Sequence, residues 1–306
     1  MSAQKKWFVL INPTSGGGRG KKHWPKISQE LKRSGINFDF RFTEFAKHGL
    51  ELIDSAIEEG HRNFIAVGGD GTLHELVNAI MTQNAVPKEL FCIGLVPVGT
   101  GNDWARHYGI PKSYKAVIDR ISRGHLVEQD IGKIVLKNSV NEPIFFNNLA
   151  GIGFDGYVVE KVNRFKHWGA MAYLIGALSG LMSYKNFMAE IQWDNNSFNG
   201  KVFMLIIGLG TYSGGGMQLT ENPDPSDGFF DISLLPAQSK FKILGMLPSL
   251  FNGAVTRKRS VKTGLAKALT ISVSEMASAV IQADGEPVGK GNFEVSILAR
   301  ALRFCV

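Results

Sequence analysis

The hydrophobic positions in the first third of the chain follow two alternating spacings. Between short apolar runs lie amphipathic segments such as residues 23–34, where Trp24, Ile27 and Leu31 share one helical face before Gly35. Apolar runs that alternate with helical spacing are typical of βαβ units. We therefore predict a parallel sheet with helices on both faces. Its expected strands are residues 6–11, 38–42, 64–67 and 91–97, with a second helix at residues 49–59.

Beyond about residue 123 the spacing changes to short strand-like runs separated by turns. Asp194, Asn195 and Asn196 form a hairpin turn signal between two of these runs. The expected strands are residues 126–136, 144–149, 188–193, 201–209, 228–235, 269–273, 279–283 and 293–299, with helices at 157–163, 168–184 and 240–251. We therefore predict an α/β domain over residues 1–124 and a mainly antiparallel β-sandwich domain over residues 125–291.

Three expected strands of the first domain lead into turns of glycine and hydroxyl residues. Residues 12–20 read NPTSGGGRG, residues 68–72 read GGDGT and residues 99–103 read GTGND. Glycine allows φ > 0 and close approach to a phosphate, and a helix that follows offers unpaired N–H groups. Ligands bind beyond the carboxyl ends of parallel strands. These turns predict one phosphate-binding crevice, and ligand-free tight turns are the alternative.

Asp70 lies in the middle turn, where the phosphates are expected. A bare carboxylate there would repel phosphate oxygens unless a cation stood between them. We therefore assign Asp70 to Mg²⁺ or to its water shell. The alternative is that Asp70 only caps the helix that continues from Thr72.

Composition and charge indicate the number of domains, the cellular compartment and the kind of partner. The length of 306 residues and the hydrophobic content of 44% fit two packed cores. Only Cys92 and Cys305 occur, and the chain begins without the apolar run of a signal peptide, so we expect a protein of the reducing cytoplasm. The net charge of +7 favours anionic partners. Nucleic acid is not expected among them, because no nucleic-acid-binding signature accompanies the charge.

Residues 168–182 form the longest apolar stretch, flanked by Lys166 and Lys185. As a helix it would span about 22 Å, short of the roughly 30 Å hydrocarbon core of a bilayer. It is therefore either a core helix or an apolar wall that contacts lipid chains, with the lysines near headgroups. The second interpretation places the protein at the periphery of an anionic membrane.

Six motifs occur in a fixed order along the chain. They are NPTSG at 12–16, GGDGT at 68–72, GTGND at 99–103, GIGFD at 151–155, PDPSDG at 223–228 and DGEP at 284–287. In this order they resemble the motifs of the diacylglycerol kinase catalytic family, in particular its soluble bacterial lipid kinases. The resemblance implies transfer of the γ-phosphoryl group of ATP to a lipid hydroxyl. It also implies that lipid enters between the two domains and that residues 292–306 return to the first.

The resemblance also assigns ligand-binding residues. Those carried over for the nucleotide are Asn12, Ser15, Gly16, Thr43, Gly68, Gly69, Asp70, Gly71, Thr72, Leu73, Thr100 and Asn102. Asp224 and Asp227 resemble the family's second Mg²⁺ site, completed by the main-chain carbonyl of Phe229. Hard oxygen ligands suit Mg²⁺. This segment is shorter and richer in proline than the family's usual form, and a plain loop is the alternative.

Asp284 and Glu286 follow the expected strand 279–283 and are candidates for the base that accepts the proton of the lipid hydroxyl. A surface turn is the other interpretation of this segment. The sequence leaves open which carboxylate removes the proton.

Diacylglycerol is the first expectation for the acceptor, although sphingoid bases, ceramide, isoprenoid alcohols and phosphatidylglycerol also present a hydroxyl beside apolar chains. An NAD kinase, which shares the GGDG motif, and a non-catalytic nucleotide or lipid sensor are the alternative functions. A homodimer is compatible with each of these functions.

Overall fold

The computed structural model describes residues 6–137, 142–162, 180–274 and 279–306. The chain divides into two compact units. Unit 1 comprises residues 1–129 and 300–306, and unit 2 comprises residues 130–299. The helix expected at residues 168–184 falls mostly outside the described residues, which contain only its last part.

Unit 1 contains a parallel sheet. Val9 and its neighbours in the first strand pair with the second and third strands, and the third strand pairs with the fourth. The strand order is β2 (Asn37–Phe42), β1 (Lys6–Ile11), β3 (Asn63–Gly68), β4 (Cys92–Pro97) and the last residues of β17 (Phe293–Cys305). This order confirms the predicted α/β class.

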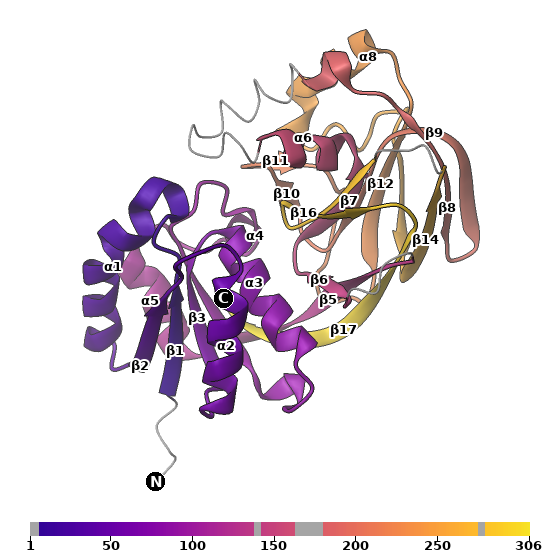
Figure 1. Cartoon of the computed structure of the whole chain (residues 1–306). Coiled ribbons are helices and arrows are strands. Elements are labelled where there is room, and N and C mark those ends of the chain that lie inside the picture. Colours follow the sequence, from indigo (N-terminus) through magenta and orange to yellow (C-terminus); the bar gives the residue numbers. More distant parts are fainter. Residues whose placement is uncertain (1–5, 138–141, 163–179, 275–278) are drawn as a thin grey trace. The chain divides into compact units, whose positions relative to one another are not determined.

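Helices cover both faces of this sheet (Figure 1). They are α1 (Ser15–Arg33), α2 (His48–Glu58), α3 (Asp70–Thr82), α4 (Asp103–His107) and α5 (Tyr114–Arg123), and a short 3-10 turn η1 spans Lys88–Leu90. On one face, Trp24 and Ile27 of α1 and Val117 of α5 pack against Val9 and Val67 of the strands. Helices α2 and α3 lie together on the other face.

Helix α1 begins earlier than the sequence indicates. Its first residues include Gly16, Gly17 and Gly18, with φ values of 61°, 69° and 90°. These left-handed conformations suit glycine and do not continue a regular helix. Regular helical geometry therefore begins only after the glycines, which explains why the hydrophobic spacing predicted the helix from residue 23.

Unit 2 is mainly antiparallel. Its described strands are the later part of β5 (Leu126–Leu136), β6 (Ile144–Phe146), β7 (Leu149–Gly153), β8 (Phe187–Trp193), β9 (Asn196–Gly208), β10 (Tyr212–Ser213), β11 (Met217–Gln218), β12 (Phe230–Pro236), β13 (Lys262–Ala266), β14 (Ala268–Val273), β15 (Val280–Ala283), β16 (Glu286–Lys290) and the first part of β17. The path β16-β15-β7-β9-β8-β14-β17 carries the sheet, and β12 pairs with β9 and β13. The expected hairpin at Asp194 joins β8 to β9. The predicted fold class of this unit is confirmed.

Helices in unit 2 are short. Among the described residues they include α6 (Phe154–Val162), α8 (Lys240–Leu244) and the 3-10 turn η3 (Leu247–Leu250). The helix predicted over residues 240–251 is therefore interrupted, because α8 ends at Leu244, before Gly245, and η3 begins at Leu247, beside Pro248. Proline and glycine both disfavour a continuous helix here.

Candidate functional site

The carboxyl ends of the parallel strands in unit 1 are tied together by backbone hydrogen bonds. The Asn12 N–H donates to the Val67 carbonyl at 3.1 Å, and the Thr43 N–H donates to the Ile11 carbonyl at 2.9 Å. The Val98 N–H donates to the Gly68 carbonyl at 2.8 Å. The residues predicted from three separate motifs therefore follow neighbouring strands at one edge of the sheet.

Two glycine turns approach each other at this edge more closely than side chains would allow. A Cβ atom on Gly99 would lie 2.6 Å from Gly69 Cα and 2.7 Å from Asn102 Oδ1. A Cβ atom on Gly69 would lie 3.7 Å from Ser15 Oγ. The fold thus brings together residues from three motifs: Ser15, Gly69, Gly99 and Asn102.

The loop after β1 is ordered by its own side chains. Asn12 Oδ1 accepts hydrogen bonds from the Thr14 N–H at 3.1 Å and from Thr14 Oγ1 at 2.9 Å. Arg19 Nε donates to the Gly16 carbonyl at 2.9 Å, and Arg19 Nη2 donates to the Gly99 carbonyl at 2.8 Å. Arg19 therefore joins two of the glycine turns. The sequence does not indicate this contact, because the Gly99 carbonyl lies 80 residues from Arg19.

Asp70 links the glycine turn at residues 68–72 to the start of helix α4. Its Oδ2 accepts a hydrogen bond from the Asp103 N–H and its Oδ1 accepts one from the Trp104 N–H, both at 3.1 Å. These donors are the first residues of α4. The carboxylate therefore caps α4 and fixes the turn at residues 99–103, whereas the alternative considered from sequence was a cap for its own helix.

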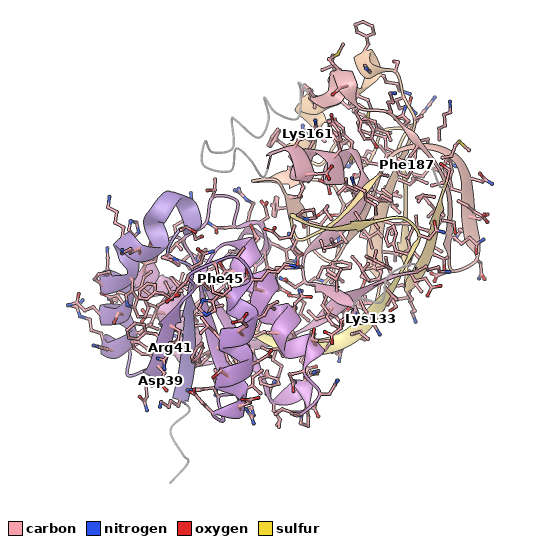
Figure 2. All side chains as sticks on the ribbon, in the orientation of Figure 1. Asp39, Arg41, Phe45, Lys133, Lys161 and Phe187 are labelled. Atoms are coloured by element: carbon pink, nitrogen blue, oxygen red, sulfur yellow. The ribbon has the colours of Figure 1, made fainter. Side chains whose placement is uncertain are left out.

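The other predicted nucleotide residues differ in exposure. Thr72 is buried, with its side chain against Gly68, and the Leu73 side chain is fully buried in the core. Thr100 is exposed and Asn102 is half-buried. Thr43 is buried. Phe45, which Figure 2 labels, is largely exposed. Its ring stacks on His48, with ring centroids 4.4 Å apart.

In unit 2, the Asp284 side chain accepts hydrogen bonds from the segment that separates β6 from β7. Its Oδ2 accepts a hydrogen bond from the Asn147 N–H at 3.1 Å. Its Oδ1 accepts from the N–H groups of Asn148 at 2.9 Å and Leu149 at 3.2 Å. These bonds explain why the strand predicted at residues 144–149 is two strands, β6 and β7. Glu286, two residues after Asp284, is half-buried at the start of β16.

The candidate metal loop at residues 223–229 is built from short local hydrogen bonds. Asp224 Oδ1 accepts from the Ser226 N–H at 2.9 Å, and Asp227 Oδ1 accepts from the Phe229 N–H at 2.9 Å. Asp130 supports the loop from β5: its Oδ2 accepts from the Gly228 N–H, and its own N–H donates to the Pro225 carbonyl, both at 2.7 Å. The sequence had not singled out Asp130.

The described part of the chain bears on two kinds of partner, metal ions and membranes. Within it, no group of three or more His, Cys, Asp or Glu side chains is arranged to hold a metal ion. The predicted loop at residues 223–229 would supply two carboxylates and one main-chain carbonyl, which is fewer than three side chains of these types. No described helix is both long enough and apolar enough to cross a membrane.

Comparison with known proteins defines the class first. Residues 6–134 match the diacylglycerol kinase catalytic domain, and residues 148–306 match the YegS C-terminal NAD kinase beta sandwich-like domain. A structure described as a putative diacylglycerol kinase from Bacillus anthracis superposes with a TM-score of 0.79 at 20% identity, covering 100% of this chain and 96% of the other. This likeness supports the fold.

Sequence relatives then define the family. A diacylglycerol kinase of Staphylococcus saprophyticus is 29% identical over 293 residues, which cover 95% of this chain and 92% of the relative. Its counterpart in Staphylococcus epidermidis is 30% identical over 288 residues, covering 94% and 87%. The chain therefore belongs to the diacylglycerol kinase family, and it is a kinase.

Proposed function

We propose that this protein transfers the γ-phosphoryl group of ATP to the free hydroxyl of diacylglycerol. The observation that carries the proposal is the contact between the glycine turns at Gly69 and Gly99, where no side chain separates the two backbones. Helix α3 begins at Asp70, directly after this contact. The N-terminal end of a helix and a backbone without Cβ atoms together suit a phosphate chain.

Phosphoryl transfer depends on positioning and on neutralising charge. Arg19 brings one guanidinium to the edge of the sheet where the glycine turns meet, and its hydrogen bonds fix the turns in place. Asp224, Asp227 and the Phe229 carbonyl offer the hard oxygen atoms that suit Mg²⁺. One oxygen of each carboxylate is used in the local turn. When bound, Mg²⁺ would offset the negative charge of the phosphates.

We assign the base role to Glu286. Asp284 already accepts three backbone hydrogen bonds, which fix its two oxygens and shape the turn. A carboxylate used in this way is better suited to holding the turn than to moving a proton. Glu286 is carried by the same turn and is only half-buried. In this scheme Asp284 orients the segment and Glu286 accepts the hydroxyl proton as the phosphoryl group is transferred.

The test is phosphate transfer from labelled ATP across an acceptor panel. Purified protein with Mg²⁺ is offered diacylglycerol, ceramide, a sphingoid base, an isoprenoid alcohol, phosphatidylglycerol and NAD. We expect labelled phosphatidic acid from diacylglycerol, and Glu286→Gln serves as the matched inactive control. Label only in NAD would favour the NAD kinase alternative. Bound ATP with no labelled product from any acceptor would favour a sensor.

We further propose that the protein acts in the cytoplasm, at the periphery of an anionic membrane, where its lipid substrate resides. A basic tip on unit 2 supports this. We define the basic tip as the exposed side chains Met182, Phe241, Leu244, Phe251, Lys240, Lys242, Arg257 and Arg259. The Lys240 ammonium donates to the Met182 carbonyl, which joins α8 to the neighbouring segment.

The composition of the basic tip suits an anionic bilayer. Residues 232–274 contain no Asp or Glu. Phe241 is 87% exposed and stands between two lysines, so its ring gains a hydrophobic environment only if something apolar covers it. Basic residues near an anionic surface and an aromatic ring in the interface both favour membrane binding.

Vesicle sedimentation without ATP tests the basic tip separately from catalysis. We expect binding to vesicles that contain phosphatidylglycerol and weak binding to phosphatidylcholine vesicles. Phe241→Ser combined with Lys242→Glu should weaken binding by about fivefold or more, because each basic residue contributes about 1 kcal/mol at such a surface. Leu90→Ser, which removes an exposed apolar side chain in unit 1 without changing the charge, should bind as the native chain does. Equal binding by all three proteins would contradict the role of the basic tip.

A further inference from the structure

Asp155 is a buried carboxylate that the proposed reaction has not used. It lies in the first turn of α6, directly after β7. Burial raises its pKa from 3.8 to about 6, and a hydrogen bond from the Gln282 side chain acts in the opposite direction. Near neutral pH the carboxylate is therefore mostly charged, although its surroundings make that charge costly.

Gln282 connects this carboxylate to the turn that carries the candidate base. Its Nε2 donates to Asp155 Oδ2 at 2.5 Å, and its Oε1 accepts from the Gly285 N–H at 2.9 Å. Gln282 is buried on β15. Its side chain thus spans from α6 to the residue between Asp284 and Glu286.

Two glycines allow this approach. A Cβ atom on Gly151, the residue that pairs with Gln282 across β7 and β15, would lie 3.0 Å from Asp155 Oδ2. A Cβ atom on Gly156 would lie 2.1 Å from the Val280 carbonyl oxygen. Helix α6 therefore packs directly on the backbone of β15, which brings Asp155 within reach of Gln282.

The charged form of Asp155 decides which way the Gln282 amide faces. An ionised carboxylate only accepts hydrogen bonds, so the amide must present its NH₂ group to Asp155. Its carbonyl oxygen is then directed to the Gly285 N–H, which is the partner that this donor needs. If the amide were reversed, its NH₂ group would face another donor, and the Gly285 backbone would lose its partner.

We propose that Asp155 is a positioning residue: through Gln282 it fixes the backbone of Gly285 and so holds Glu286 in the geometry for proton transfer. This inference rests on the proposed function for the role of Glu286, but the hydrogen-bond relay itself does not. In this relay Asp155 bonds to Gln282, and Gln282 bonds to the turn at residues 284–287. The effect of Asp155 on Glu286 therefore passes through Gln282. An amide at position 155 could donate as well as accept and would no longer enforce the orientation.

The test is Asp155→Asn, measured for activity, stability and hydrogen exchange. A displaced catalytic group can lower turnover by about a hundredfold, so we expect kcat to fall by about tenfold to a hundredfold with KM for ATP unchanged. Stability at pH 8 should be equal to or higher than that of the native chain, because the buried charge is gone. Backbone amide exchange at residues 284–286 should become faster.

Gln282→Leu, alone and combined with Asp155→Asn, completes a double-mutant cycle. If the two residues act in one relay, the double variant should lose no more kcat than the more severe single variant. Multiplied losses would overturn the proposal, as would native kcat with native exchange in Asp155→Asn. If the native chain phosphorylates no acceptor, the proposed function fails, while amide exchange at residues 284–286 still tests the relay.

Discussion

At the residue scale, substitution of the two carboxylates of the DGEP turn should affect different properties, turnover for one and stability for the other. Glu286→Gln should lower kcat by about 10² to 10⁴, the usual contribution of a positioned base, with little change in unfolding stability. Asp284→Asn should instead destabilise the fold by about 1 to 3 kcal/mol, because the backbone donors of residues 147–149 lose charged acceptors. Turnover and denaturant unfolding of both variants check this. The assignment is reversed if Asp284→Asn keeps native stability and alone abolishes turnover.

Asp155 should leave a signature in the pH dependence of stability. The pKa of this group is raised from 3.8 to about 6 in the folded chain. Between these values the folded state holds a proton that the unfolded state has released, so stability falls as pH rises through the window, by about 3 kcal/mol in total. Denaturant unfolding at pH 4 and pH 7 measures the change. The difference between the native chain and Asp155→Asn isolates this group, and identical pH profiles would show that Asp155 is not the source.

Two important carboxylates could be predicted from the sequence, but their hydrogen-bond donors could not. Asp70 and Asp284 stood out because each follows a predicted strand within a glycine turn. Their actual donors, at Trp104 and at Asn148, lie 34 and 136 residues away and carry no periodic signal. Backbone N–H groups are present at every residue except proline, so a sequence does not show which of them will meet a given side chain.

At the scale of elements, the meeting of the glycine turns should be sensitive to one methyl group. Gly99→Ala would place a Cβ atom 2.6 Å from Gly69 Cα, so the turns must move apart. We expect a cost of about 1 to 3 kcal/mol in unfolding stability and weaker ATP binding. Calorimetric titration with an ATP analogue and thermal unfolding measure the two effects.

Gly245→Ala is the matched control for that substitution. At Gly245 a Cβ atom would meet its nearest neighbours at 3.5 and 3.6 Å, and the backbone φ of −67° suits any residue. Its unfolding stability should stay within about 0.5 kcal/mol of the native value, with unchanged ATP binding. Native ATP affinity in Gly99→Ala would mean that the approach of these turns does not shape the nucleotide site.

Elements with strong hydrophobic spacing were predictable, and their interruptions were not. The strands of unit 1 were placed to within a residue or two because apolar runs define them. The break between β6 and β7 was missed because residues 144–149 are apolar at both ends, and the break depends on Asp284 withdrawing the Asn147 and Asn148 N–H groups. Long-range hydrogen bonds of this kind decide where a ladder stops.

At the scale of the whole molecule, the last residues of the chain complete unit 1. Arg303 and Phe304 pair with Cys92 and Ile93 of β4, and the buried Sγ atoms of Cys92 and Cys305 lie 3.2 Å apart. Composition alone offered no reason to bring these two cysteines together. The strand expected at residues 293–299 continues through Arg300, whose φ of 48° marks the point where the chain passes from unit 2 to unit 1.

Phe304 therefore tests whether the nucleotide site depends on the end of the chain. Its ring is fully buried and packs on the Trp104 ring, with ring centroids 5.1 Å apart. The backbone N–H of Trp104 is one of the two donors to Asp70. Phe304→Ala should destabilise unit 1 by about 3 to 5 kcal/mol and weaken ATP binding, since the cavity loosens the helix that Asp70 caps. Phe304→Leu should cost less than about 1.5 kcal/mol and keep ATP affinity near native. Denaturant unfolding together with ATP titration at low denaturant distinguishes the two variants. Native ATP affinity in a destabilised Phe304→Ala would show that α4 holds its place at Asp70 without support from the terminal strand.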